Sequence, residues 1–218
     1  RPMISAQDHK RAYDGDRGPN TGGMGTYAPA PVMTPEMTKR AVEEILEPTI
    51  ATMAQEGRTY RGCLYLGLMV TADGPKVVEF NARFGDPETQ VVLPLLDSDL
   101  VAIMCACADG TLADVPIRWK DGAAVCVVLV SGGYPGHYDK GQEIHGLADA
   151  EAMGALVFHA GTAMKDGKLV TNGGRVLGVV GRGADISSAV DAAYAAATKI
   201  SFKDAYYRKD IAHRALER

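Results

Sequence analysis

The chain has 218 residues and a formal net charge of −4, with 46% hydrophobic and 23% charged residues. This is ordinary globular composition for one large or two small domains, and the lack of a basic stripe argues against a protein that binds nucleic acid or an anionic membrane. The longest apolar runs, such as residues 123–130, are far shorter than the roughly 20 residues that span a bilayer, so we expect no membrane segment.

Residues 1–35 are rich in Gly, Pro, Asn and Asp and show little periodicity. This pattern predicts a long ordered loop with at most one short strand, at residues 3–5. A helix should begin where Thr34 caps Pro35, because apolar residues then recur at helical spacing as far as Gly57. Pro48 should kink or split that helix.

Two apolar runs, at residues 62–71 and 76–82, flank a turn that contains an Asp-Gly pair. They predict an antiparallel hairpin. Residues 89–108 show near-helical spacing that is broken at Pro94, which indicates two helices, the second capped around residues 97–99.

The pattern changes after residues 109–121, a short polar stretch that is the best candidate for a linker between domains. Short β-rich runs follow, and then a helix is expected at residues 186–201. The runs are residues 123–131, 155–163, 168–171 and 175–181. This part should form a small, mainly antiparallel α+β domain.

The second run of the hairpin ends in polar residues. Side chains alternate between the faces of a strand, so the polar ones should share one face while the apolar ones point to the core. The polar set is Glu79, Asn81 and Arg83, and the apolar set is Val78, Phe80 and Ala82. A carboxylate and an amide oxygen beside a guanidinium suit Mg²⁺ and phosphate. The alternative is a half-buried strand that carries exposed polar residues.

Three further groups of residues could bind ligands. Asp86 and Glu88 flank Pro87 in a turn after the strand, Asn20-Thr21-Gly22-Gly23 could cradle phosphates with backbone N–H groups, and His9 and Lys10 lie in a basic cluster. By composition alone, the glycine-rich stretch could equally be a flexible surface loop, the basic cluster a solvated face, and Asn172-Gly173-Gly174-Arg175 a hairpin turn.

The run RFGDPETQ at residues 83–90 resembles the signature of the glycinamide ribonucleotide synthetase family, ATP-grasp ligases of purine synthesis. The segments QDHKR, GPNTGGMG, GGYPG and NGGRVL, which begin at residues 7, 18, 132 and 172, agree with it. The resemblance implies an α+β fold, with the carboxyl-terminal lobe of an ATP-grasp domain at residues 1–112 and the family's carboxyl-terminal domain at 113–218. It covers only the carboxyl-terminal half of that enzyme, and with arginine as the first residue we expect a fragment.

The resemblance also implies a reaction. ATP phosphorylates the carboxylate of glycine, and the amine of 5-phosphoribosylamine attacks the glycyl phosphate, giving glycinamide ribonucleotide, ADP and phosphate. Mg²⁺ or Mn²⁺ would bind Glu79 and Asn81, Arg83 would neutralise the transferred group, and Asp86 and Glu88 would orient the amino groups.

Binding residues are implied in the same way. His9, Lys10 and the loop Asn20, Thr21, Gly22 and Gly23 would contact the nucleotide. Pro87 would line the substrate site with its two acidic neighbours. Asn172, Gly173, Gly174 and Arg175 would bind substrate, with the arginine on the ribosyl 5′-phosphate.

Two alternatives remain beside this ligase. One is a different ATP-grasp ligase, such as a biotin-carboxylase-like or formate-dependent enzyme, and the other is a fragment that binds substrate or phosphate without catalysis. The expected partners are the three substrates and the missing amino-terminal half, in a monomer that binds neither nucleic acid nor membrane. The cysteines have no Cys-x-x-Cys pair, which predicts buried reduced thiols and a cytoplasmic protein; they are Cys63, Cys105, Cys107 and Cys126.

Overall fold

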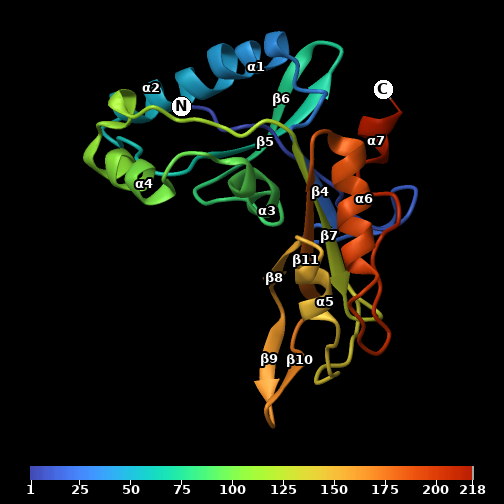
Figure 1. Ribbon diagram of the computed structural model, residues 1–218. Helices are drawn as coiled ribbons and strands as arrows, with labels where there is room; N and C mark the ends of the chain where they lie inside the picture. The colour runs from blue at the N-terminus through green and yellow to red at the C-terminus, as the bar shows by residue number, and fades with distance from the viewer. Residues whose placement is uncertain (218) are drawn as a thin grey trace. The chain divides into compact units, whose positions relative to one another are not determined.

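The computed structural model describes residues 1–217 as mixed α+β, with antiparallel strand pairs and helices (Figure 1). The chain forms two compact units. The hairpin unit comprises Arg1–Ser5, Ala30–Gly85 and Leu96–Lys120, and the sheet unit comprises Ala6–Pro29, Asp86–Leu95 and Asp121–Arg218. The units therefore alternate along the chain. The expected division between residues 112 and 113 stays a prediction, and its last residue, Arg218, lies outside the described residues.

The long helix of the hairpin unit begins and divides as predicted. Helix α1 (Pro35–Ala41) is capped by Thr34, whose hydroxyl accepts a hydrogen bond from the N–H of Met37 at 3.2 Å. A π-helical turn, η1 (Val42–Leu46), then leads into α2 (Glu47–Gln55). Pro48 lies in the first turn of α2, directly after the π-helical turn, so the regular α-helix is interrupted just before the proline.

The predicted hairpin is also confirmed. Strand β5 (Tyr65–Thr71) pairs antiparallel with β6 (Gly74–Asn81), and the register shifts between Gly67 and Leu68. Helix α4 (Leu100–Asp109) begins at the N-cap Asp99, which accepts a hydrogen bond from the N–H of Ala102. A 3₁₀ turn, η3 (Leu112–Asp114), follows it.

The faces of β6 differ from the prediction. Val78 is 65% exposed and Phe80 is 46% exposed, and Ala82, beyond the strand, is exposed too. These residues therefore do not face a core within the described chain. The physical reason is that β5 and β6 form a sheet of only two strands, so alternation alone cannot supply a layer that covers the apolar face.

The sheet unit is built on five antiparallel strands in the order β1-β4-β7-β11-β8. The strands are β1 (Gln7–Asp8), β4 (Gly25–Ala28), β7 (Ala123–Val130), β11 (Arg175–Gly183) and β8 (Leu156–His159). Every residue of β7 is buried, as expected of an apolar central strand.

The amino-terminal segment is more regular than predicted. Instead of a loop with a strand at residues 3–5, it contains β1, β4 and a small hairpin of β2 (Arg11–Tyr13) and β3 (Arg17–Asn20). Sequence patterning missed these strands because they are two to four residues long, too short for a period to emerge. Of these strands, β4 pairs with β7, which lies about a hundred residues later in the chain, and β1 pairs in turn with β4.

Helix α6 (Ile186–Ala197) packs on β7 and β11 (Figure 1). Its face toward the sheet is alanine, and Gly181 of β11 lies so close that an added Cβ would be 2.2 Å from the N of Ala193. Small residues on both elements thus permit a short distance between helix and sheet. The remaining elements are α3 (Thr89–Val92), η2 (Leu93–Leu95), α5 (Leu147–Ala152), β9 (Thr162–Lys165), β10 (Lys168–Thr171) and α7 (His213–Leu216).

The cysteines are free, as predicted, but only Cys126 is buried. Cys63 and Cys107 are half-buried and Cys105 is exposed, because they lie in the small hairpin unit and not under the sheet. Among residues 1–217, no helix is both long enough and apolar enough to cross a membrane.

Candidate functional site

In the hairpin unit, β6 presents the predicted metal pair. Glu79 and Asn81 are two residues apart on this strand, so their side chains leave the same face. Glu79 lies opposite Gly67 of β5, and an added Cβ on Gly67 would be 2.9 Å from its Cγ. Arg83 is exposed just beyond the strand, and its Nη1 donates to the carbonyl of Phe84 at 3.0 Å.

The pair fits Mg²⁺ better than it fits a metal enclosed by protein. The described residues contain no group of three His, Cys, Asp or Glu side chains that could hold an ion. Mg²⁺ is typically bound by one or two protein oxygens and completed by water and substrate phosphates. One carboxylate and one amide oxygen on an open strand face match that donor set, with room left for phosphate.

In the sheet unit, three predicted site residues lie together. Arg175, the first residue of β11, forms a bidentate ion pair with Asp86, at 3.0 Å from Oδ1 and 3.3 Å from Oδ2. The same guanidinium donates to the carbonyl of Gly22 at 2.9 Å. Gln90 donates a further hydrogen bond to Asp86. Asp86 and Arg175 are therefore engaged with each other in this structure, and their predicted contacts with substrate stay predictions.

The backbone N–H groups of the glycine-rich loop are also engaged. Thr21 donates to the carbonyl of Lys10, Gly22 to the hydroxyl of Tyr134, and Gly23 to the hydroxyl of Thr21. Asn20 ends β3 opposite Arg11. The predicted phosphate cradle would need some of these bonds to open, and it stays a prediction.

The glycines of this loop are required by close packing. An added Cβ on Gly22 would lie 2.9 Å from Cζ of Arg175. One on Gly23 would lie 2.5 Å from Cδ of Pro87 and 2.8 and 3.0 Å from the two carboxylate oxygens of Asp8, and Gly23 also has a φ of +121°. The loop thus contacts Asp8, Pro87 and Arg175 at backbone distance.

Asp8, at the end of β1, carries an unusual carboxylate. Its side chain is 6% exposed, and the ammonium of Lys10 lies 2.7 Å from Oδ2 as an ion pair. This ammonium and the backbone of His9 both favour the charged form of the carboxylate. Burial raises the pKa of Asp8 to about 6, Lys10 lowers it, and the charge of the buried Glu88 raises it further.

The segment Asn172-Gly173-Gly174 is not the turn of a hairpin. It joins β10, which pairs with β9, to β11, which pairs with β7 and β8. Ser131 holds it, donating from its N–H to Gly174 and from its hydroxyl to Gly173. These bonds fix the start of β11, from which Arg175 projects, and the predicted contacts of the segment with substrate stay predictions.

His9 points away from Asp8 toward a cluster of polar side chains that are paired with one another. Its Nδ1 donates to the carbonyl of Gly25 at 3.2 Å, and its Nε2 accepts from the N–H of Ala212 at 3.3 Å. Burial lowers the pKa of His9 to about 4, with a further contribution from Arg208. The ring is 2% exposed, so in this structure His9 is a scaffold residue, and its predicted contact with nucleotide stays a prediction.

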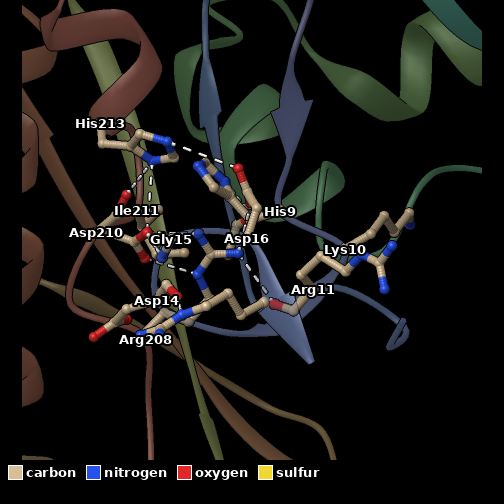
Figure 2. Close-up of polar contacts among 12 residues, drawn as sticks. His9, Lys10, Arg11, Asp14, Gly15, Asp16, Arg208, Asp210, Ile211 and His213 are labelled. Carbon is tan, nitrogen blue, oxygen red and sulfur yellow. Dashed lines mark hydrogen bonds and ion pairs between the residues drawn. The ribbon is translucent and has the colours of Figure 1, made fainter. Parts of the chain in front are cut away.

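Arg208 is the centre of that cluster (Figure 2). Its side chain is fully buried and forms a two-point ion pair with Asp210, at 2.7 Å for both bonds, and a third bond with Asp16 at 3.0 Å. Arg214 pairs with the other oxygen of Asp16. We call Arg208, Asp16, Asp210, His213 and Arg214 the Arg208 cluster.

The structure thus brings together the loop, the turn and Arg175, which the sequence singled out, with Asp8 and Tyr134, which it did not. A signal for Asp8 was available: it alternates with His9, so it must lie on the other side of the strand, beside Lys10. Tyr134 belongs to the GGYPG segment, yet nothing in its spacing indicated a bond with Gly22.

Two family models match the chain. Residues 1–89 match the ATP-grasp (A) domain of phosphoribosylglycinamide synthetase, and residues 124–214 match its C domain. The phosphoribosylamine–glycine ligase of Synechocystis is 54% identical over 217 residues, which is 99% of this chain and 52% of that protein.

Solved structures agree. The crystal structure of phosphoribosylamine–glycine ligase from Thermotoga maritima is 42% identical with a TM-score of 0.84, and it covers 96% of this chain and 51% of that one. The biotin carboxylase domain of Hydrogenobacter thermophilus 2-oxoglutarate carboxylase, solved with MgADP, has a TM-score of 0.55 at 17% identity over 84% of this chain and 40% of that one, a likeness of fold alone.

The chain belongs to the phosphoribosylglycinamide synthetase family and has the ATP-grasp fold. It spans about half the length of the curated relatives that it matches, and it corresponds to their carboxyl-terminal half.

Proposed function

We propose that this chain is part of a phosphoribosylamine–glycine ligase, which joins glycine to 5-phosphoribosylamine at the expense of ATP. The observation that carries the proposal is the combination of an oxygen pair for a metal on β6 with the Asp86–Arg175–Gly22 arrangement reached five residues further along the chain. The relatives that share 54% and 42% of the residues carry that ligase's name.

The reaction needs positioning and charge neutralisation more than a covalent nucleophile. The γ-phosphoryl group of ATP passes to the carboxylate of glycine, and the amine of 5-phosphoribosylamine then displaces phosphate from the glycyl phosphate. Mg²⁺, or Mn²⁺, held by Glu79 and Asn81, would supply positive charge to the phosphate oxygens. Arg83 is free of acidic partners among the described residues and would bind the transferred group.

We assign the substrate side to the sheet unit. Arg175 is presented by a fixed strand end and suits bidentate binding of the ribosyl phosphate, provided that the phosphate displaces Asp86. That exchange replaces one anion by another on the same guanidinium. Asp86 would then be released to meet an amino group, as the sequence suggests.

The exposed apolar residues of the hairpin unit support a missing partner. Several large side chains there have more than two fifths of their area exposed: Met69, Val77, Val78, Phe80, Val101 and Met104. Isolated apolar residues are common on surfaces, but here they lie on the hairpin and on α4 of one unit. We propose that the other half of the synthetase covers them.

The test is a chimaera in which this chain replaces the corresponding half of the Synechocystis ligase. We expect ADP release that requires glycine, 5-phosphoribosylamine and Mg²⁺ together. Glu79→Ala and Asn81→Ala should each reduce turnover at least about 100-fold, since the metal term is worth several kcal/mol. Glu56→Gln, an exposed acid after α2, is the matched control and should leave turnover unchanged.

ADP release that is indifferent to glycine would mean that the fold is right but the substrate is wrong. Absence of any turnover in a folded chimaera would refute the proposal in its present form. Mixing the two halves as separate chains then shows whether covalent linkage is needed: restored turnover requires only that the halves associate.

A further inference from the structure

The GGYPG segment, residues 132–136, follows β7 and brings one side chain to the glycine-rich loop. The N–H of Gly22 donates to the hydroxyl of Tyr134 at 3.1 Å, and the carbonyl of the same glycine accepts from Arg175 at 2.9 Å. All three residues belong to the sheet unit. A phenol and a guanidinium therefore meet one residue of the loop, the first at its N–H and the second at its carbonyl.

Two hydroxyls accept hydrogen bonds from the backbone of this loop, and they differ in the use of their own protons. Thr21 accepts from the N–H of Gly23 at 3.0 Å and donates to the carbonyl of Lys10 at 2.9 Å, so its hydroxyl is fully engaged. Tyr134 accepts from Gly22, and its proton has no acceptor in the part of the chain that the structure describes. A phenol oxygen can donate one hydrogen bond while it accepts another. The Tyr134 hydroxyl thus keeps a donor available at the loop.

The ring of Tyr134 is held in place by its surroundings. It lies against the backbone of Gly174, where an added Cβ would be 2.2 Å from Cδ2 of the ring, and the ring of Tyr138 packs on it edge to face. Ser131, which binds the segment before β11, also accepts from the N–H of Tyr134 at 3.1 Å. One framework therefore holds both the phenol and the strand end from which Arg175 projects, and donors that are already ordered lose little entropy when they bind a ligand.

Asp86 uses only one of these two donors. Its carboxylate oxygens lie 3.0 and 3.3 Å from the guanidinium of Arg175, and within residues 1–217 it forms no hydrogen bond with Tyr134. A phosphate monoester has three terminal oxygens, so it can make both bonds to the guanidinium and still offer an oxygen to a further donor. A phosphate that replaced Asp86 would therefore use the phenol proton that the carboxylate leaves unused.

We propose that Tyr134 binds the 5′-phosphate of the ribosyl substrate, donating its hydroxyl proton to a phosphate oxygen beside the bidentate contact of Arg175. The inference rests on the proposed function, because that reaction supplies a sugar phosphate monoester. The hydrogen bond that Tyr134 accepts from Gly22 polarises the phenol and strengthens its proton as a donor. Tyr134 then helps to select the phosphorylated sugar, since it meets the group that the dephosphorylated sugar lacks.

The first experiment places Tyr134→Phe in the chimaera. The substitution keeps the ring and removes only the hydroxyl, so KM for 5-phosphoribosylamine should rise at least about 10-fold, the value of a hydrogen bond to a charged group. KM for ATP and KM for glycine should stay within about twofold of the parent's values. A rise confined to ATP would assign the hydroxyl to a nucleotide phosphate, and an equal rise for all three substrates would mean that Tyr134 only holds the loop. Either result overturns the proposal.

Tyr138→Phe is the matched control. The ring of Tyr138 lies beside that of Tyr134, with centroids 6.3 Å apart, and its hydroxyl forms no hydrogen bond within the described residues. This variant should match the parent in all three KM values, and the proposal is overturned if the two variants agree for 5-phosphoribosylamine. A misfolded variant is recognised by its melting temperature. Tyr134→Phe should melt close to the parent, because Gly22 is exposed and water can accept from its N–H.

A second measurement needs no turnover, so it separates failure of this proposal from failure of the proposed function. The 218-residue chain is titrated with ribose 5-phosphate in a calorimeter, and with ribose as the probe that lacks the phosphate. The parent should prefer ribose 5-phosphate, and Tyr134→Phe should bind it at least about 10-fold more weakly while Tyr138→Phe binds it as the parent does.

A parent that binds ribose 5-phosphate no better than ribose would overturn the proposal, and so would equal affinities of Tyr134→Phe and the parent. If the affinities differ as expected while ADP release by the chimaera is indifferent to glycine, the phosphate site stands and the ligase assignment fails.

Discussion

Two neighbouring residues of the sheet unit, Asp8 and His9, have different polar surroundings. His9 and the Arg208 cluster form a region in which buried charges and ring nitrogens have partners, and Figure 2 shows Asp16 and Asp210 beside the guanidinium of Arg208. Asp8 lies in a region where a buried carboxylate has one half-exposed ammonium, that of Lys10, as its charged partner.

The difference separates scaffold from site. Satisfied groups fix the segment from Asp14 to Asp16 to the carboxyl-terminal segment around Arg208, through side-chain and backbone bonds. Asp8 is buried with one half-exposed ammonium as its charged partner, and burial raises its pKa to about 6, so its ionised form opposes folding at neutral pH. Substitutions in the two regions should therefore differ in sign and not only in size.

The largest effect should come from Arg208→Met. The substitution leaves Asp16 and Asp210 without their buried partner, and loss of one member of such a pair typically costs about 3–5 kcal/mol. Urea unfolding of the 218-residue chain measures it. Arg208→Lys should recover only part of the lost unfolding free energy, because an ammonium cannot make the two-point contact with Asp210. Arg182→Met, on an exposed arginine of β11, is the control, and an equal loss there would contradict this account.

The next effect concerns His9 and acid. Because burial lowers its pKa from 6.5 to about 4, its contribution to stability is present above pH 6.5 and is lost as pH falls toward 4. The loss should amount to about 3 kcal/mol by linkage. His9→Gln should be less stable at pH 8 but should show a flatter dependence between pH 6.5 and 4. An unchanged slope in unfolding free energy against pH would mean that His9 does not titrate in this window.

Asp8→Asn should act in the opposite direction. The pKa of Asp8 is raised from 3.8 to about 6, so its favourable contribution is present below pH 3.8 and is lost as pH rises through 6. The variant should be more stable than the parent by about 2–3 kcal/mol at pH 8, and the gain should vanish below pH 4. Unfolding free energies at the two pH values test it, and a destabilised variant at pH 8 would show that Asp8 belongs to the scaffold.

The smallest effect should follow Asp86→Asn. Asp86 is 54% exposed in its side chain, so its pair with Arg175 is screened by water and is worth about 0–1 kcal/mol. Raising the salt concentration should further reduce the difference in unfolding free energy between the parent and the variant. Parallel urea titrations at low and high salt measure it. A loss as large as that of Arg208→Met would place this pair with the scaffold and not with the site.

Local signals predicted much of the fold. Thr34 and Asp99 cap helices as expected, Pro48 divides one, and the Asp-Gly turn joins β5 to β6, because each of these depends on a few adjacent residues. The family signature likewise located Arg175 and the turn at Asp86, which the structure brings together.

The features that the sequence did not predict depend on contacts between distant parts of the chain. Val78 and Phe80 are exposed because no layer within the described chain covers β6. Strand β4 was missed because its partner β7 is distant in sequence, and β1, which pairs with β4, was missed with it. Asp8 was overlooked beside a conspicuous histidine. Its raised pKa follows from burial in the folded chain, which no sequence pattern reports.

The alternation of the two units along the chain has a consequence for dissection. The chain passes from one unit to the other five times, so no single cut yields either unit intact. A truncation that begins at residue 113 would retain β7 but lose β1 and β4, and the side of β7 that pairs with β4 would become an open edge available to other molecules. Shuffling of parts in this family is therefore expected to succeed with whole halves and to fail with pieces cut at the apparent linker.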